Sequence, residues 1–335
     1  MAQPARALDP SPSALRPEPV SVICTVLNEA GSIDQLLASL AAQTRPPDQI
    51  VIVDAGSSDG TWDKLQSWRA GGLPLLPLPR IGANISRGRN EAIRAASGEI
   101  IAVTDAGVRL DPSWLAALLV PFERDDPPEV VSGFFVADPR SVFELALGAT
   151  TLPAVEDVRP TEFLPSSRSV AFRKSAWQQV GGYPEWLDYG EDLVFDLALK
   201  RAGCRFAWAP EAIARFRPRP SPGRFFQQYY RYARGDGKAL LWARRHLIRY
   251  ATYIGTPVLI RRTGGHPLTL AVAILAGLAY CRRPLRRLQP ALAELPPVDR
   301  ARSVALVPLI RLIGDVAKMV GYPIGLLWRL RHRPG

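Results

Sequence analysis

The chain has 335 residues, of which 47% are hydrophobic and 22% charged, an ordinary composition for a globular protein with an adequate core. This length suits one large α/β domain, or one domain with an appendage. Its three cysteines lack the spacing of a metal site and suit a reducing compartment. Its three histidines all lie beyond residue 240, which excludes a histidine-based metal site or triad before that point.

The net charge of +11 is distributed unevenly. Residues 244–335 contain 16 basic and 3 acidic residues, whereas residues 1–243 contain 26 basic and 28 acidic residues. A strongly basic segment predicts an anionic partner, either lipid headgroups or nucleic acid. Arginine-rich codon usage is the alternative explanation, but it would not spare residues 1–243.

Residues 1–19 are rich in Pro, Ala and Ser, lack the apolar run of a signal peptide, and are predicted to form a disordered leader. Apolar strand-like runs then alternate with helical patterns, which predicts a mostly parallel α/β sheet. The predicted strands are residues 20–27, 49–54, 100–104, 130–136 and 170–173. The predicted helices are residues 33–43, 61–70, 86–97, 192–202 and 225–241. The Pro-rich residues 137–169 are predicted to be an irregular loop region.

Two apolar stretches lie among the C-terminal arginines. Residues 267–281 are apolar except for Thr269, but they fall short of the ~20 residues that span a bilayer. Residues 304–328 are interrupted by Arg311, Asp315 and Lys318, which share one helical face. This pattern predicts a helix that lies in a membrane interface or on the protein, more than a span.

Polar residues follow three predicted strands at their carboxyl ends, where open α/β sheets bind ligands. These residues are Thr25, Asn28, Glu29, Asp54 and Asp105. A strand-end aspartate can accept hydrogen bonds from a base N–H or from ribose hydroxyls. The alternative is that Asp54 and Asp59 only cap the next turn and helix. For Asp54 and Asp105 together, the pattern favours ligand binding.

Five segments in a fixed order resemble the family 2 glycosyltransferases of the GT-A fold. They are VSVICTVLNE, VDAGSSDGT, SRGRNEAIRAASGEIIAVTDAG, GGYPEWLDYGEDLVFDLALKRAG and QYYRY, and they cover roughly residues 20–238. The resemblance implies a Rossmann-like, mostly parallel sheet with helices on both faces, in a catalytic domain at residues 20–243. Residues 244–335 are then a basic, helical, membrane-associated tail. A fragment ending near residue 243 is expected to stay soluble and to bind nucleotide.

The resemblance implies that the first half of the domain holds a sugar-nucleotide donor. Thr25, Asp54 and Asp105 would contact the base and ribose, with Asn28 and Glu29 beside them. Arg89 matches an arginine–asparagine pair of the family and could meet the nucleotide, although an exposed helix arginine is an equal alternative.

The pair Glu191–Asp192 matches the family's acidic pair at a helix start, with the catalytic base at Asp192. A carboxylate within reach of the attacking hydroxyl can take its proton. A base on the face opposite the leaving diphosphate gives inversion. The alternative is an acid pair that stabilises a helix N-terminus.

The segment QYYRY resembles the glutamine–arginine–aromatic motif of processive members, with Tyr in place of Trp. The resemblance implies that Gln228 and Arg231 help to hold the diphosphate and the acceptor end. An amphipathic helix with a solvated arginine is the alternative, and the tyrosine argues against processivity.

The sequence departs from the family at its metal-binding motif, because Gly107 replaces the usual second carboxylate of Asp-X-Asp. Ala55 likewise follows Asp54, where many members have a second aspartate. Dependence on Mg²⁺ or Mn²⁺ is therefore expected to be weakened or absent, unless other groups bind the ion. The candidates for stabilising the leaving group are Arg168, Arg173, Arg231 and Lys238.

These patterns together predict an inverting glycosyltransferase that moves a sugar from a nucleotide-diphosphate donor to a hydroxyl acceptor. The acceptor would be a lipid or lipid-linked glycan, and the enzyme would sit peripherally or shallowly inserted on the cytoplasmic face of the cell membrane. One alternative is a degenerate sugar-nucleotide-binding protein, favoured by Gly107 and disfavoured by Asp192. The other is a nucleic-acid-binding protein, but apolar stretches beside arginines fit a membrane better, so no nucleic acid is expected.

Overall fold

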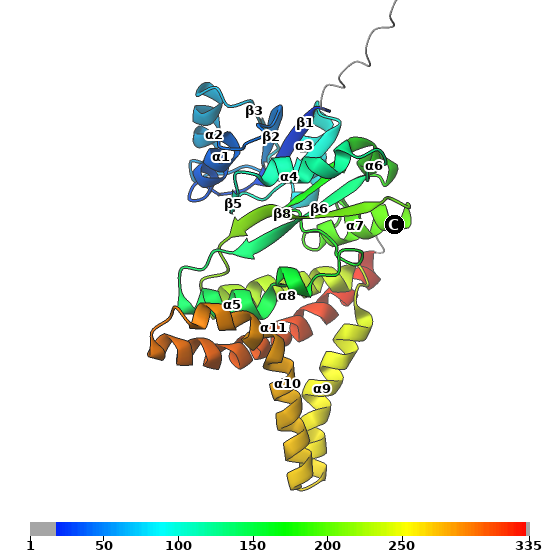
Figure 1. The fold of residues 1–335 in the computed structure, drawn as a ribbon. Helices are drawn as coiled ribbons and strands as arrows, with labels where there is room; N and C mark the ends of the chain where they lie inside the picture. Colours follow the sequence, from blue (N-terminus) through cyan, green and yellow to red (C-terminus); the bar gives the residue numbers. More distant parts are fainter. Residues whose placement is uncertain (1–17, 333–335) are drawn as a thin grey trace, which may run out of the picture.

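The computed structural model describes residues 18–332, so the leader expected at residues 1–19 lies almost wholly outside the described residues. Its centre is an eight-stranded sheet with the order β3-β2-β1-β4-β7-β6-β8-β5 (Figure 1). The strands are β1 (Val20–Val26), β2 (Gln49–Asp54), β3 (Leu75–Pro79), β4 (Ile100–Val103), β5 (Val108–Leu110), β6 (Val130–Ala137), β7 (Val170–Arg173) and β8 (Phe206–Phe216). Four of the seven described pairings are parallel, which confirms a mostly parallel sheet.

Helices cover both faces of this sheet, and others form a separate layer. They are α1 (Ile33–Ala41), α2 (Thr61–Ala70), α3 (Ile85–Ala95), α4 (Trp114–Leu119), α5 (Val142–Thr151), α6 (Lys174–Gln179), α7 (Glu191–Arg201), α8 (Pro222–Lys238), α9 (Ala243–Arg262), α10 (Pro267–Leu292) and α11 (Pro297–His332). Val22 and Ile50 pack with α1, α2 and α4 on one face, and Ile23 and Val51 pack with α3, α6 and α7 on the other. Because neighbouring residues of β1 and β2 are buried on opposite faces, these strands are continuous apolar runs.

The sequence-based prediction missed the strands β3, β5 and β8 and the helices α5 and α6. β3 reads Leu-Leu-Pro-Leu-Pro and lies at the sheet edge, where proline is tolerated but hides the strand pattern. β5 has only three residues, and β8 mixes small and charged residues because much of it is only half-buried. The prediction that residues 137–169 are irregular is wrong for α5. The hydroxyl of Ser141 caps α5 by accepting from the Glu144 N–H, a Ser-X-X-Glu signal that is visible in the sequence.

The helix α11 crosses α8 and α5 and completes a layer beneath one half of the sheet (Figure 1). Ile310 of α11 packs with Phe225 of α8 in a shared apolar cluster. Gly237 of α8 lies where α11 crosses, and an added Cβ there would collide with the Tyr322 carbonyl oxygen. Gly325 of α11 makes the reciprocal close approach to α8. Asp315 of α11 is buried, and Arg311 and Lys318 lie over tyrosine rings, so the charged face that was expected in a membrane interface or on the protein is turned toward the protein.

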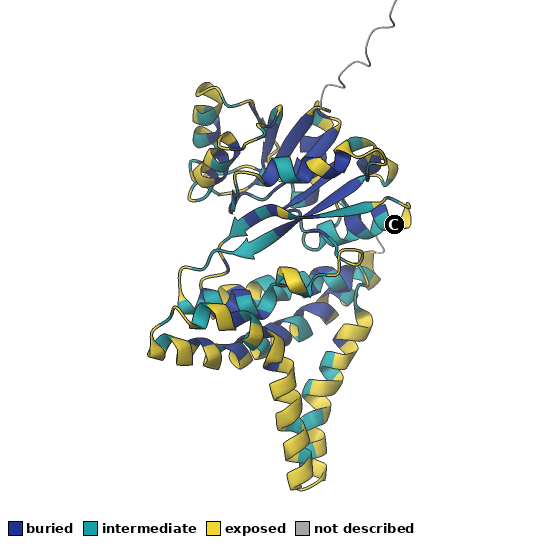
Figure 2. Cartoon of the chain, viewed as in Figure 1, coloured by how far each residue is buried: buried dark blue, intermediate teal, exposed yellow. Residues whose placement is uncertain are grey.

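The helices α9 and α10 form a hairpin that projects away from the body (Figure 1), and most of its surface is exposed (Figure 2). Neither residues 250–260 nor residues 267–281 include a charged side chain. The apolar stretch that falls short of a span in the sequence continues as a helix of 26 residues. Among the described helices, α10 alone is long and apolar enough to cross a membrane, judged by length and composition.

Candidate active site

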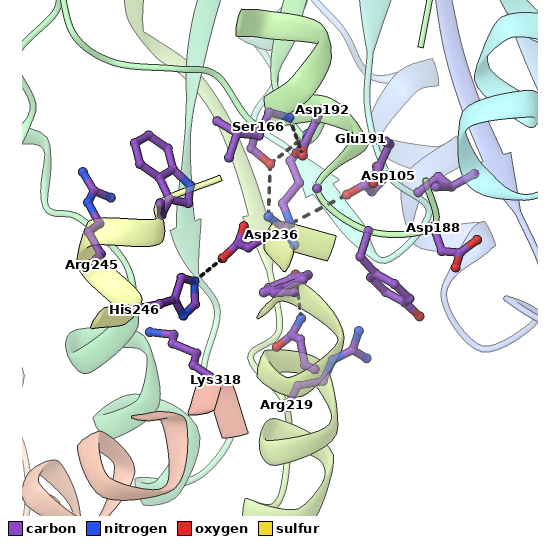
Figure 3. A pocket seen from close by; sticks show the side chains of 18 of the residues that line it. Asp105, Ser166, Asp188, Glu191, Asp192, Arg219, Asp236, Arg245, His246 and Lys318 are labelled. Atoms are coloured by element: carbon purple, nitrogen blue, oxygen red, sulfur yellow. Dashed lines mark hydrogen bonds and ion pairs between the residues drawn. The ribbon is translucent and has the colours of Figure 1, made fainter. Parts of the chain in front are cut away.

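A cavity of about 530 Å³ opens between the carboxyl ends of the sheet strands, α7, α8 and the C-terminal helices (Figure 3). The site residues that sequence predicts and that line this cavity are Arg89, Asp105, Glu191, Asp192 and Gln228. Arg231 lines a smaller adjoining cavity of about 150 Å³, which shares Gln228 with the first. Thr25, Asn28, Glu29 and Asp54 do not line either space.

The residues at the ends of β1 and β2 are engaged in hydrogen bonds within and between the two loops that follow these strands. One oxygen of Asp54 accepts from the N–H groups of Gly56 and Ser57, at 2.9 and 2.7 Å. Asn28, in the left-handed region at φ 56°, accepts from the Ser58 N–H at 2.9 Å. These contacts fit the capping alternative for Asp54, and its role toward a base stays a prediction.

Two further residues of this region are held from within the fold. The Glu29 N–H donates to the hydroxyl of Thr61, and the Glu29 carboxylate accepts from Ser32. Thr25 packs against Gly88 of α3, where a Cβ would collide with the threonine side chain. The buried Thr25 hydroxyl has no hydrogen-bond partner among the described residues. Both donor-binding roles stay predictions.

Arg89 is buried and joins two acids that are far apart in the sequence. Its guanidinium lies 2.6 Å from a Glu191 oxygen and 2.9 Å from an Asp105 oxygen. Burial alone would lower the pKa of Arg89, but the Glu191 and Asp105 carboxylates raise it, so the group stays charged. The alternative of an exposed helix arginine is therefore wrong.

The neighbours of Arg89 on α3 hold the chain that leads to α7. The Asn90 side chain donates to the Tyr183 carbonyl and accepts from the Tyr183 N–H, both at 2.9 Å. Ser86 donates to the Leu187 carbonyl at 3.1 Å. Sequence reasoning did not assign this positioning role, although the buried face Ser-X-X-Arg-Asn carries it.

The acidic pair splits into two environments at the start of α7. Gly190 precedes the pair at φ 78°, a left-handed conformation that glycine adopts without strain. Asp192 faces the cavity and bonds only to the neighbouring Leu193 N–H, at 2.8 Å, among the described residues. Glu191 is buried, and burial together with Asp192 raises the pKa of Glu191 to about 7 against the opposing effect of Arg89. Asp192 thus presents to the cavity a carboxylate without an ion-pair partner among residues 18–332, while Glu191 pairs with Arg89.

The site does not fit a divalent cation as it is arranged. The two oxygens of Asp105 face Arg89 at 2.9 Å and Arg168 at 3.8 Å. Residues 18–332 contain no group of three or more His, Cys, Asp or Glu side chains that could hold a metal ion. Gly107 adjoins open space, since a Cβ added there would meet nothing within 4 Å.

The other leaving-group candidates divide by location. Arg168 lines the cavity and lies over the Phe216 ring at 4.4 Å. Arg231 is beside the cavity and donates to the Tyr189 hydroxyl at 2.9 Å. Arg173 is ruled out, because it pairs with Glu18 near the opposite ends of the strands. Lys238 forms an ion pair at 3.0 Å with Asp188, which lines the cavity.

The C-terminal helices also line the cavity, and sequence reasoning missed them. Arg245, His246 and Arg249 come from α9, and Lys318 comes from α11. His246 Nε2 lies 3.2 Å from Asp236 of α8. The sequence did carry a signal for Lys318, because Arg311, Asp315 and Lys318 interrupt the otherwise apolar residues 304–328.

The chain matches two family models, "Glycosyl transferase family 2" over residues 21–168 and "Glycosyl transferase family group 2" over residues 157–313. It is 30% identical over 137 residues to the validoxylamine A glucosyltransferase of Streptomyces hygroscopicus subsp. limoneus, spanning 39% of this chain and 30% of the relative. It is 26% identical over 281 residues to an N-acetylglucosaminyltransferase of Mesorhizobium japonicum, spanning 78% of this chain and 65% of the relative. The chain thus spans less than two thirds of the length of both relatives.

The structure is similar to that of a mannosyltransferase from Pyrobaculum calidifontis determined with GDP-mannose and Mn²⁺. The TM-score is 0.54 at 21% identity, and the match covers 98% of this chain and 92% of the other. This likeness confirms the GT-A fold. With two matching family models that together reach from residue 21 to residue 313, the chain belongs to the family 2 glycosyltransferases.

Proposed function

We propose that the protein transfers a sugar from a nucleotide-diphosphate donor to a hydroxyl acceptor with inversion at the anomeric carbon. The observation that carries the proposal is Asp192, a carboxylate that faces the cavity without an ion-pair partner among the described residues. The acceptor oxygen forms a bond to the anomeric carbon, the bond to the diphosphate breaks, and Asp192 takes the hydroxyl proton.

Positioned cations take the place of a tightly bound metal in this proposal. Arg168 and Arg89 bring fixed positive charge to the cavity beside Asp105. Charge that develops on the leaving diphosphate would be stabilised by Arg168, the more accessible of the two. The Mn²⁺ in the structure of the Pyrobaculum mannosyltransferase supports divalent metal use in this fold. For this chain we infer weakened or absent dependence on Mg²⁺ or Mn²⁺, because both Asp105 oxygens already face arginines.

The acceptor is proposed to be a lipid or a lipid-linked glycan at the cytoplasmic face of the cell membrane. The apolar hairpin of α9 and α10 starts at the cavity and projects from the body (Figure 1), which brings a membrane and the cavity close together. Arginines flank its apolar segments, and an anionic surface attracts them. Cell-envelope polysaccharide synthesis would use such an acceptor.

Asp192→Asn tests the catalytic assignment, because it removes the proton acceptor but keeps size and polarity. We expect transfer to fall by roughly 100-fold or more, while donor binding in a thermal-shift screen of nucleotide sugars is unchanged. Asp63→Asn, an exposed aspartate on α2, is the control for the substitution itself. Near-normal turnover by Asp192→Asn would contradict the assignment. Donor binding without transfer by the wild type would support the degenerate alternative.

A further inference from the structure

One wall of the cavity is formed by the C-terminal helices and carries three cations. Arg245 and Arg249 come from the first two turns of α9, and Lys318 comes from α11. We call these three residues the basic wall. Figure 3 shows Arg245 and Lys318 on the side of the cavity away from Asp105.

Two members of the basic wall lack an acidic partner. Arg245 lies over the Trp242 ring at 4.1 Å, and Lys318 lies over the Tyr229 ring at 4.9 Å. Neither forms an ion pair with any carboxylate of residues 18–332. Burial, together with the neighbouring Arg249, lowers the pKa of Lys318 to about 8, against the opposing effect of Asp315. A bound anion would pair with both side chains.

The acids near the basic wall are already engaged. Asp315 accepts from Arg249 at 2.8 Å and from two tyrosine hydroxyls. His246 lies between two charged groups, with Nδ1 3.1 Å from Arg249 and Nε2 3.2 Å from Asp236. The unpaired positive charge therefore stays on the other two members of the basic wall.

The basic wall lies where the apolar hairpin joins the body. The helix α9 begins at Ala243 beside the cavity, so the positive end of its dipole adds to the wall. From Tyr250 the same helix continues into the uncharged part of the hairpin. A molecule with an anionic head and a long apolar chain fits both surfaces at once.

We propose that the acceptor carries a phosphate or diphosphate group next to its lipid chain, and that this group binds to the basic wall. The group is not changed in the reaction: a hydroxyl beyond it attacks the donor, and its proton passes to Asp192. This inference rests on the proposed function, because it names the acceptor class of the same cavity.

A binding experiment tests the anion site without requiring sugar transfer. The probes are farnesyl diphosphate and farnesol in detergent micelles, with the donor side filled by saturating amounts of the nucleoside diphosphate that stabilises the protein most. We expect farnesyl diphosphate to bind at least about tenfold more tightly than farnesol, and Lys318→Met with Arg245→Gln to remove this difference. Arg282→Gln with Arg283→Gln, two exposed arginines of α10 outside the cavity, should keep it.

Four results would overturn the inference. One is equal binding of the two probes by the wild type, and another is an unchanged preference in the wall variant. The third is an equal loss in the Arg282/Arg283 control, and the fourth is equal competition by added phosphatidylglycerol, since either assigns the effect to bulk membrane charge. If the pattern holds but no nucleotide sugar supports transfer, the proposed function fails while the anion site stands. The nucleotide-induced thermal shift of each variant checks that it is folded.

Discussion

Asp105 lies between two guanidinium groups, which changes what this carboxylate can do. In the family motif a second acid usually binds the divalent ion, whereas here Gly107 takes that place and Asp105 faces Arg89 and Arg168. An arginine presents fixed positive charge without a coordination shell and suits phosphate oxygens well. Replacement of the second acid by Gly107 thus coincides with arginines that supply positive charge in the cavity.

Gly107→Asp should restore part of a metal site. The position is open, so the new side chain meets no steric obstacle, and a second carboxylate favours a hard divalent cation. We expect the variant to bind Mn²⁺ at least about tenfold more tightly than the wild type by titration calorimetry. Gly107→Asn, similar in size but uncharged, should not. Wild-type transfer is expected to survive chelation, so its loss and recovery with one equivalent of metal would contradict the account.

The residues that sequence could place are those inside local motifs. Asp105 and Asp192 are brought to one cavity as the motif order predicts, because strand ends and helix starts meet at one edge of the sheet. The role of Lys318 could not be predicted, since its neighbours come from helices far earlier in the chain. Burial of Arg89 is equally a tertiary property, because a helix pattern alone does not show what covers it.

At the scale of elements, the hairpin of α9 and α10 exposes large apolar side chains to water. Leu259 of α9 and Ile274 and Leu275 of α10 are exposed by 54%, 63% and 63% (Figure 2). Exposed apolar patches of this kind mark interaction surfaces, and a bilayer interface buries such side chains favourably. Sequence patterns located the apolar segments, but only the packing distinguishes the projecting hairpin from α11, one face of which packs on α8 and α5.

We predict that the protein cosediments with anionic vesicles and that high salt releases it only partly. Salt screens the arginine–headgroup attraction but not apolar insertion. Ile274→Glu with Leu275→Glu should reduce the bound fraction in high salt by at least about tenfold, because two charges would enter the apolar layer. Ile81→Glu, at a residue 86% exposed in the loop after β3, is the matched control. Failure of the wild type to bind vesicles at low salt would contradict the membrane proposal.

At the scale of the whole molecule, the C-terminal helices take two different roles. The helix α11 shares an apolar cluster with α5 and α8, including Phe225 and Ile310. It also approaches α8 closely at Gly237 and Gly325. The projecting part of the hairpin adds little to this packing, whereas the second half of α10 packs through Leu288 on Val307 of α11, and Tyr253 and Tyr280 donate to Asp315. Removal of α11 and removal of the hairpin should therefore have different consequences.

Two deletions separate these roles. Sequence reasoning predicts that a fragment ending near residue 243 stays soluble, whereas the packing of α11 predicts that this fragment exposes Phe225 and loses its cooperative unfolding. Replacing residues 254–279 with four glycines keeps the Asp315 contacts at the hairpin base and spans the distance between packed helices. We expect this second variant to retain a cooperative thermal transition and the nucleotide-induced shift but to lose vesicle binding. Calorimetry and cosedimentation of both variants check the prediction. A stable, nucleotide-binding fragment ending at residue 243 would instead place the boundary of the catalytic domain where the sequence does, and would reduce α11 to an accessory of the hairpin.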